Sequence, residues 1–111
     1  MLDPKYIEKI REYGGKEAVA EIVQLYLADQ VQILGHIREA LAANDPARLR
    51  DRVHALKGCS INLGAVGIGS LCEKIEELGC AGEMSEAAAV IDQLELEASS
   101  VRDKLQLELS K

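Results

Sequence analysis

The sequence contains no phenylalanine and no tryptophan, and its only aromatic residues are Tyr6, Tyr13 and Tyr26. Proline occurs only twice, at Pro4 and Pro46. Residues that favour β-strands are therefore few, whereas leucine and alanine, both strong helix formers, occur 15 and 14 times. This balance predicts an all-α protein.

Other absences exclude whole classes of function. There is no apolar run near the roughly 20 residues that a membrane-spanning helix needs, and no apolar signal region at the N-terminus. With 13 basic against 19 acidic residues and a net charge of −6, the chain lacks the basic surface that non-specific nucleic-acid binding requires. Its three cysteines have neither disulfide-framework nor zinc-site spacing. We therefore expect a cytoplasmic protein with no metal, no membrane and no nucleic acid among its ligands.

Start and stop signals divide the chain into one short and four longer helices. A capping carboxylate followed by proline, as at Asp3-Pro4, begins a helix, and Gly14-Gly15 ends one. Gly64, Gly67 and Gly69 are expected to loosen the chain before the fourth helix, and Ser85 to cap the last one. The expected helices cover about residues 4–13, 16–43, 46–63, 68–78 and 85–105.

These helices predict an antiparallel up-down-up-down four-helix bundle, because four substantial helices are joined by short loops. The short N-terminal helix is expected to cover one end of the bundle. At 111 residues the chain has the length of one domain, and no linker or repeat interrupts it, so a single domain over residues 1–111 is predicted.

The helix over residues 46–63 carries a histidine on its outer side. At 100° per residue, His54 lies roughly 140° and Gly58 roughly 180° from the centre of the inward apolar row. An exposed glycine inside a helix costs about 1 kcal/mol relative to alanine, so its presence needs a reason. Gly58 lies one turn after His54, where a missing side chain clears the approach to the imidazole. The alternative is that Gly58 lets another helix pack closely. The inward row consists of Leu49, Val53, Leu56, Ser60 and Leu63.

The same helix is basic in an acidic chain. Residues 46–65 hold four basic residues and one acidic residue, so this segment carries +3 and the remainder carries −9. Such a segment suits a phosphoryl group on His54 or an acidic partner, and the alternative is an ordinary solvated helix face. Glutamates elsewhere, including Glu73, Glu76 and Glu77, are expected to be solvated.

The run from His54 to Ala65, HALKGCSINLGA, resembles the signature of histidine-containing phosphotransfer (HPt) domains, H-x-L-K-G-small-S-x-x-L-G-A. The resemblance extends over nearly the whole chain, and its one departure is Cys59, where serine or alanine is more usual. It implies a role in a two-component phosphorelay, in which one histidine carries a phosphoryl group between aspartates of receiver domains. By this match His54 is the phosphoacceptor through Nε2, Lys57 neutralises the phosphoryl charge and Gly58 provides access.

The resemblance also implies partners: response-regulator receiver domains and a hybrid histidine kinase. The chain is then a phosphocarrier, either stand-alone or part of such a kinase, and no enzyme in its own right, because it lacks a glycine-rich nucleotide loop. Receiver domains would supply the aspartate and the magnesium ion, so no cofactor is expected in this chain.

Two further residues are candidates for the site. Arg50, one turn before His54, lies on the same side and is a second candidate for phosphoryl stabilisation. Ile61, roughly 120° from the inward centre, is a candidate for an apolar docking patch together with exposed parts of the long helix. His36 has no Lys-Gly pair after it and is expected to be structural or solvated. A monomer is expected.

Two alternatives stay open at this point. The chain could be a helical adaptor that binds a receiver or kinase domain without carrying phosphate, or a purely structural helical bundle. The intact His54, Lys57 and Gly58 favour phosphotransfer, because a degenerate member of the family would be expected to lose the histidine.

Overall fold

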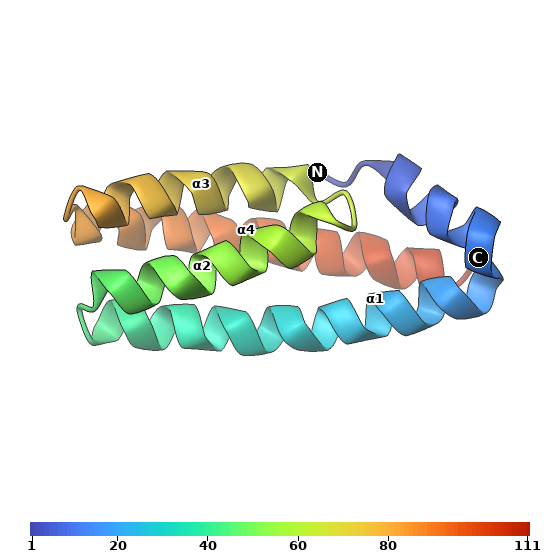
Figure 1. Ribbon diagram of the computed structural model, residues 1–111, viewed down its shortest axis with the longest axis horizontal. Helices are drawn as coiled ribbons and strands as arrows, with labels where there is room; N and C mark the ends of the chain where they lie inside the picture. Colours follow the sequence, from blue (N-terminus) through green and yellow to red (C-terminus); the bar gives the residue numbers. More distant parts are fainter.

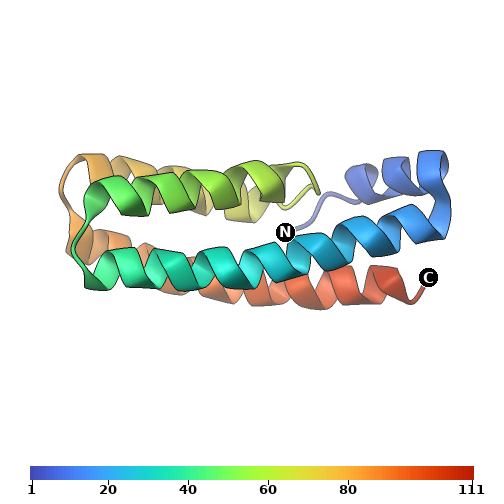
Figure 2. The ribbon, with the colours of Figure 1, turned by 60° about the horizontal axis from the view of Figure 1, so that its bottom comes forward.

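A computed structural model describes residues 1–111. It contains no strand and four helices: α1 (Pro4–Ala42), α2 (Pro46–Ile61), α3 (Val66–Cys80) and α4 (Met84–Leu109). The helices run alternately up and down, and α1 packs against both α2 and α4 while α3 packs against α2 and α4 (Figure 1 and Figure 2). The predicted all-α, up-down-up-down bundle is therefore confirmed.

A sharp bend divides α1 into a short and a long limb. Gly15 has φ 70° and ψ −168°. This backbone conformation lies outside the helical region, and residues other than glycine rarely adopt it. Residues 4–14 consequently turn back as a separate short helix, drawn in dark blue in Figure 1. It begins as predicted, because the side chain of Asp3 accepts a hydrogen bond from the Lys5 backbone amide and Pro4 follows.

This short limb covers one end of the bundle, because the helices differ in length. With 16 and 15 residues, α2 and α3 are much shorter than α4 with 26. Ile7 of the short limb is 1% exposed, and Arg11 pairs with Glu108 of α4 at 2.9 Å. The backbone amide of Asp3 donates to the carbonyl of Gly64 in the α2–α3 connection at 2.8 Å. The short limb therefore occupies the space beyond the ends of α2 and α3.

Two local expectations about the second half of the chain are wrong. Gly67 and Gly69 do not loosen the chain but lie inside α3, which begins at Val66. A Cβ on Gly69 would come within 3.0 Å of a side-chain carbon of Ile61, so this glycine lets α2 approach closely. Glu83 rather than Ser85 precedes α4, and no side chain caps that helix.

The core is apolar except for one chain of buried hydrogen bonds. Twenty-two buried apolar residues form it, and the inward row predicted for α2 is buried throughout. The Tyr26 hydroxyl lies 2.7 Å from Ser60 Oγ, Gln30 Nε2 donates to that hydroxyl, and Arg102 donates to Gln30 Oε1 at 3.1 Å. Burial raises the pKa of Tyr26. These contacts tie α2 and α4 to α1.

Two of the glycines of α1, Gly15 and Gly35, allow a test of the bend. Gly15→Ala is expected to lower the free energy of unfolding by about 1–3 kcal/mol, because alanine is strained at this φ and ψ. Gly35→Ala is the matched control: the position is exposed and helical with open space around it, so alanine should stabilise by about 0.5–1 kcal/mol. Urea denaturation of both variants measures the difference. Equal effects would contradict the assigned role of Gly15.

Candidate functional site

One face of α2 meets α3 in a regular antiparallel ladder. At four successive levels a side chain of α2 stands opposite a residue of α3, and the residue numbers of each pair add to 130. His54 lies near the middle of the ladder. The pairs are Arg50 with Cys80, His54 with Glu76, Lys57 with Glu73, and Ile61 with Gly69.

His54 projects from the bundle but rests against a carboxylate. Its side chain is 72% exposed, and its Nδ1 lies 3.4 Å from Oε1 of Glu76. That oxygen is buried and has no hydrogen-bond partner. A proton on Nδ1 would satisfy it, and the Nε2 lone pair would then be free for attack on an incoming group. The outward phase predicted for His54 is confirmed.

Lys57 lies at the margin of the same face, as its position on the helix predicts. Its side chain is 23% exposed, and its Nζ lies 3.3 Å from Oε1 of Glu73, a residue that is 60% exposed. The stem of the lysine is thus packed while its ammonium group stays close to solvent.

Gly58 is exposed, and a Cβ built there would meet no atom within 4 Å. Close packing by another helix is therefore not the reason for this glycine, and that alternative is wrong. The open surface beside His54 remains as the physical consequence of the missing side chain.

A polar hollow of about 410 Å³ surrounds the imidazole, and Arg50, Asp51, His54 and Glu76 line it. The guanidinium of Arg50 has no carboxylate partner, and its Nη1 lies 3.6 Å from Sγ of Cys80. The structure therefore brings Arg50 to the hollow that holds the imidazole. It also places carboxylates of α3 over the basic face of α2.

Glu73 and Glu76 are residues of this site that the sequence pattern does not reveal. The expectation that both are solvated is wrong for Glu76, whose side chain is only 22% exposed. A signal exists in their spacing, because Glu73 and Glu76 are three positions apart, as are His54 and Lys57. Using it requires the register of α3 on α2, which no local pattern supplies.

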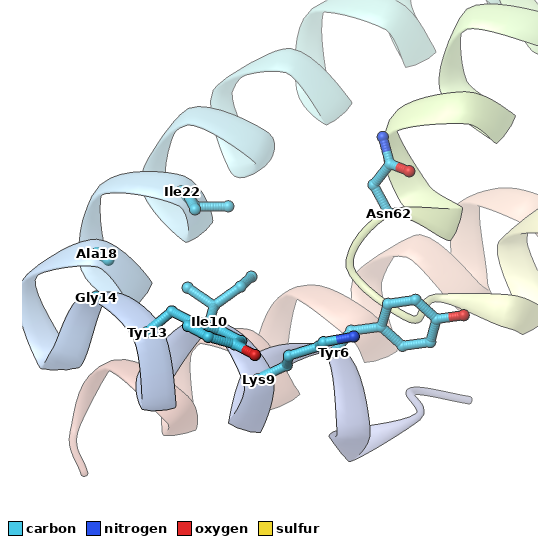
Figure 3. Close-up of a pocket in the computed structure, with 8 residues that line it drawn as sticks. All are labelled: Tyr6, Lys9, Ile10, Tyr13, Gly14, Ala18, Ile22 and Asn62. Carbon is cyan, nitrogen blue, oxygen red and sulfur yellow. The ribbon is translucent and has the colours of Figure 1, made fainter.

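A second, apolar hollow lies on the other side of α2, toward α1. Its volume is about 470 Å³, and Figure 3 shows Tyr6, Ile10 and Tyr13 of the short limb on one side, with Ile22 and Asn62 across from them. An adjoining hollow of about 280 Å³ shares several of these residues and extends to Leu25.

Exposed apolar side chains accompany these hollows. Ile22 and Leu25 of α1 are 40% and 66% exposed, and Ile61 of α2 is 37% exposed. The partial exposure predicted for Ile61 is confirmed, but this side chain lies on the α3 side of α2, opposite Gly69, and lines neither hollow. We call Ile22 and Leu25 the apolar rim.

Two of the three cysteines, Cys59 and Cys72, are unsuited to nucleophilic chemistry. All three are free thiols. Cys72 is fully buried, and burial raises its pKa to about 12; burial also raises the pKa of Cys59. Both therefore remain protonated near neutral pH and are poor nucleophiles.

The structure shows neither a cluster of metal-ligating side chains nor a membrane-spanning helix. No group of three or more histidine, cysteine, aspartate or glutamate side chains is arranged to hold a metal ion. None of the four helices combines the length and the apolar character needed to span a membrane.

Comparison with known proteins gives one consistent result. The family model described as "Hpt domain" matches residues 21–104. The chain is 27% identical over 110 residues to histidine-containing phosphotransfer protein 2 of Arabidopsis thaliana, covering 95% of this chain and 70% of that protein. It is 28% identical over 102 residues to histidine-containing phosphotransfer protein 4 of the same plant, covering 90% of this chain and 80% of that protein.

A solved structure agrees with these relatives. The crystal structure of histidine-containing phosphotransfer protein B (HptB) from Pseudomonas aeruginosa PAO1 matches with a TM-score of 0.91 and 31% identity, covering 98% of this chain and 94% of that one. Sequence and fold therefore point to the same group of proteins.

The contact between His54 and Glu76 makes a spectroscopic prediction. In the wild type, ¹⁵N NMR should show the neutral imidazole of His54 mainly protonated at Nδ1, and Glu76→Ala should move this proton toward Nε2. His36 is the internal control, because its ring forms no ion pair or hydrogen bond in the structure, so its signals should not move. An unchanged His54 tautomer in Glu76→Ala would refute the assigned contact.

Proposed function

Because the chain belongs to the Hpt domain family, we propose that it is a phosphocarrier of a two-component phosphorelay, with His54 as its phosphoacceptor. Family membership supports the phosphorelay role. The observation that carries the assignment to His54 is its 72% exposed imidazole set against the buried carboxylate of Glu76. The other histidine, His36, is half-buried and has no such partner.

The proposed step is a direct phosphoryl transfer from an aspartyl phosphate of a receiver domain. The Nε2 lone pair of neutral His54 attacks phosphorus, a P–N bond forms, and the P–O bond to the aspartate breaks. The aspartate leaves as a carboxylate with the bonding electron pair. The proton on Nδ1 stays, so the phosphorylated ring is cationic and faces the Glu76 carboxylate. Onward transfer to a second receiver is the reverse of this step.

Glu76 supports both directions of this reaction. Before transfer it selects the tautomer with a free Nε2, and after transfer it stabilises the positive charge on the ring. A cationic ring is also the better leaving group, so the phosphoryl group remains transferable. Glu76 thus acts as a positioning residue through His54, since it does not touch the phosphoryl group.

Lys57 and Arg50 are proposed to stabilise the phosphoryl group. Lys57 lies three residues after His54 and Arg50 four before it, so both neighbour the imidazole on the helix surface. A phosphoryl group carries a charge of about −2 near neutral pH, which two cations at its side offset.

Gly58 and the apolar rim are proposed to receive the partner. Transfer requires a receiver's aspartate to come within a few ångströms of Nε2, so the partner must cover the surface around His54. Gly58 leaves that surface open. Toward α1 the two apolar hollows and the apolar rim offer area that a receiver domain can bury, while the basic side chains of α2 suit its acidic site.

The partner completes the chemistry in this proposal. The receiver domain supplies the aspartate and the magnesium ion, so the chain itself needs no cofactor. A hybrid histidine kinase is the proposed source of the phosphoryl group, since the chain is proposed to have no kinase activity. The setting is the cytoplasm, and the proposed working form is a monomer with His54 uncovered.

Substitution of the histidine is the central test. With a receiver domain carrying a ³²P-labelled aspartyl phosphate as donor, the wild type should acquire label that is labile in acid and stable in base. His54→Gln should acquire none, whereas His36→Gln, the matched control, should be labelled like the wild type. Label persisting on His54→Gln would refute the assignment. A wild type that binds the receiver but takes no label would favour the adaptor alternative.

A second test separates access from stability. Gly58→Gln should slow transfer by about tenfold to a hundredfold, because a long side chain then covers the approach to Nε2. The same substitution should raise the free energy of unfolding by about 0.5 kcal/mol, since glutamine is the better helix former. Gly35→Gln, in an exposed part of α1, should give the same stabilisation without slowing transfer. Faster transfer by Gly58→Gln would contradict the access role.

A further inference from the structure

Lys57 already forms an ion pair in the unphosphorylated protein. Its Nζ lies 3.3 Å from a carboxylate oxygen of Glu73, on the neighbouring helix. The proposed function asks the same ammonium group to neutralise a phosphoryl group on His54. A single ammonium group that moves toward the phosphoryl group must weaken its contact with Glu73 or lose it.

The geometry makes this exchange easy. Lys57 lies one helical turn after His54 on the same face, and its stem is packed against the bundle with 23% of the side chain exposed, whereas Glu73 is 60% exposed. An exposed ion pair contributes little to stability and breaks at small cost. Lys57 can therefore change partners without any movement of the helices.

The charges around His54 determine how much this change of partner costs. Three carboxylates, from Asp51, Glu73 and Glu76, lie on or beside the face that holds two cations, Arg50 and Lys57. A phosphoryl group adds a further charge of about −2. Once Lys57 turns to it, the carboxylate of Glu73 has no partner and repels the new charge.

We propose that Glu73 competes with the phosphoryl group for Lys57 and thereby keeps phospho-His54 a strong donor. This inference rests on the proposed function and adds a residue to it. Glu73 is a positioning residue that acts through Lys57: it raises the free energy of the phosphorylated chain relative to the unphosphorylated one and so favours transfer onward to an aspartate. The bonds that form and break are those of the transfer described above.

The test measures the position of equilibrium. The wild type and variants are mixed with a receiver domain carrying a ³²P-labelled aspartyl phosphate, and the label on each protein is counted once it stops changing. Glu73→Gln removes the competing charge and keeps the shape of the side chain. It should shift the equilibrium toward phospho-His54 by about two- to fivefold, the range expected for an exposed ion pair.

Two controls separate this role from a general charge effect. Glu77→Gln removes the same charge from an exposed position of α3 that forms no ion pair, and should leave the equilibrium within error of the wild type. On a Lys57→Met background, Glu73→Gln should shift the equilibrium much less, because the residue competed for is gone and only direct repulsion by the carboxylate remains. Circular dichroism melting curves check that all variants fold.

Each outcome decides the question. An unshifted Glu73→Gln equilibrium with a normally labelled wild type overturns this inference and leaves the proposed function intact. A shift of equal size in Glu77→Gln, or on the Lys57→Met background, also overturns it, because the effect then does not pass through Lys57. A wild type that takes no label at His54 refutes the proposed function, and the inference with it.

Discussion

The antiparallel register of α2 on α3 is the constraint on which the site depends. Gly69 lets Ile61 approach α3 closely, and the levels that follow along the two helices bring His54 to Glu76 and Lys57 to Glu73. A slip of one residue would turn each glutamate about 100° away from its partner. The chemistry proposed for His54 therefore rests on helix packing more than on any feature of α2 alone.

The two sides of α2 differ in chemistry. Toward α3 the side chains are ionisable and surround the imidazole with charge. Toward α1 the surface is apolar, because the short limb of α1 folds back beside the end of α2 and leaves hollows between them. Gly58 separates the two sides. A partner placed over this glycine would meet the nitrogen that is proposed to react and an apolar surface at once.

Carboxylates of α3 offset part of the positive charge of the basic segment of α2. Taken alone, residues 46–65 form a positive island in an acidic chain, which would hold a phosphoryl group tightly. In the bundle, Glu73 and Glu76 offset part of that charge. A carrier must release its phosphoryl group as well as accept it, and a partly neutralised site is suited to both.

The sequence by itself determined the helical class, the break at Gly15 and the outward position of His54 and Gly58. Each of these follows from helix periodicity or from the backbone freedom of glycine, which act over a few neighbouring residues. Only the tertiary structure decided that Gly69 belongs inside α3 as a packing glycine and that Glu76 faces the imidazole. Both depend on how α3 lies against α2, and that register is set by packing between residues distant in the sequence, which no local pattern encodes.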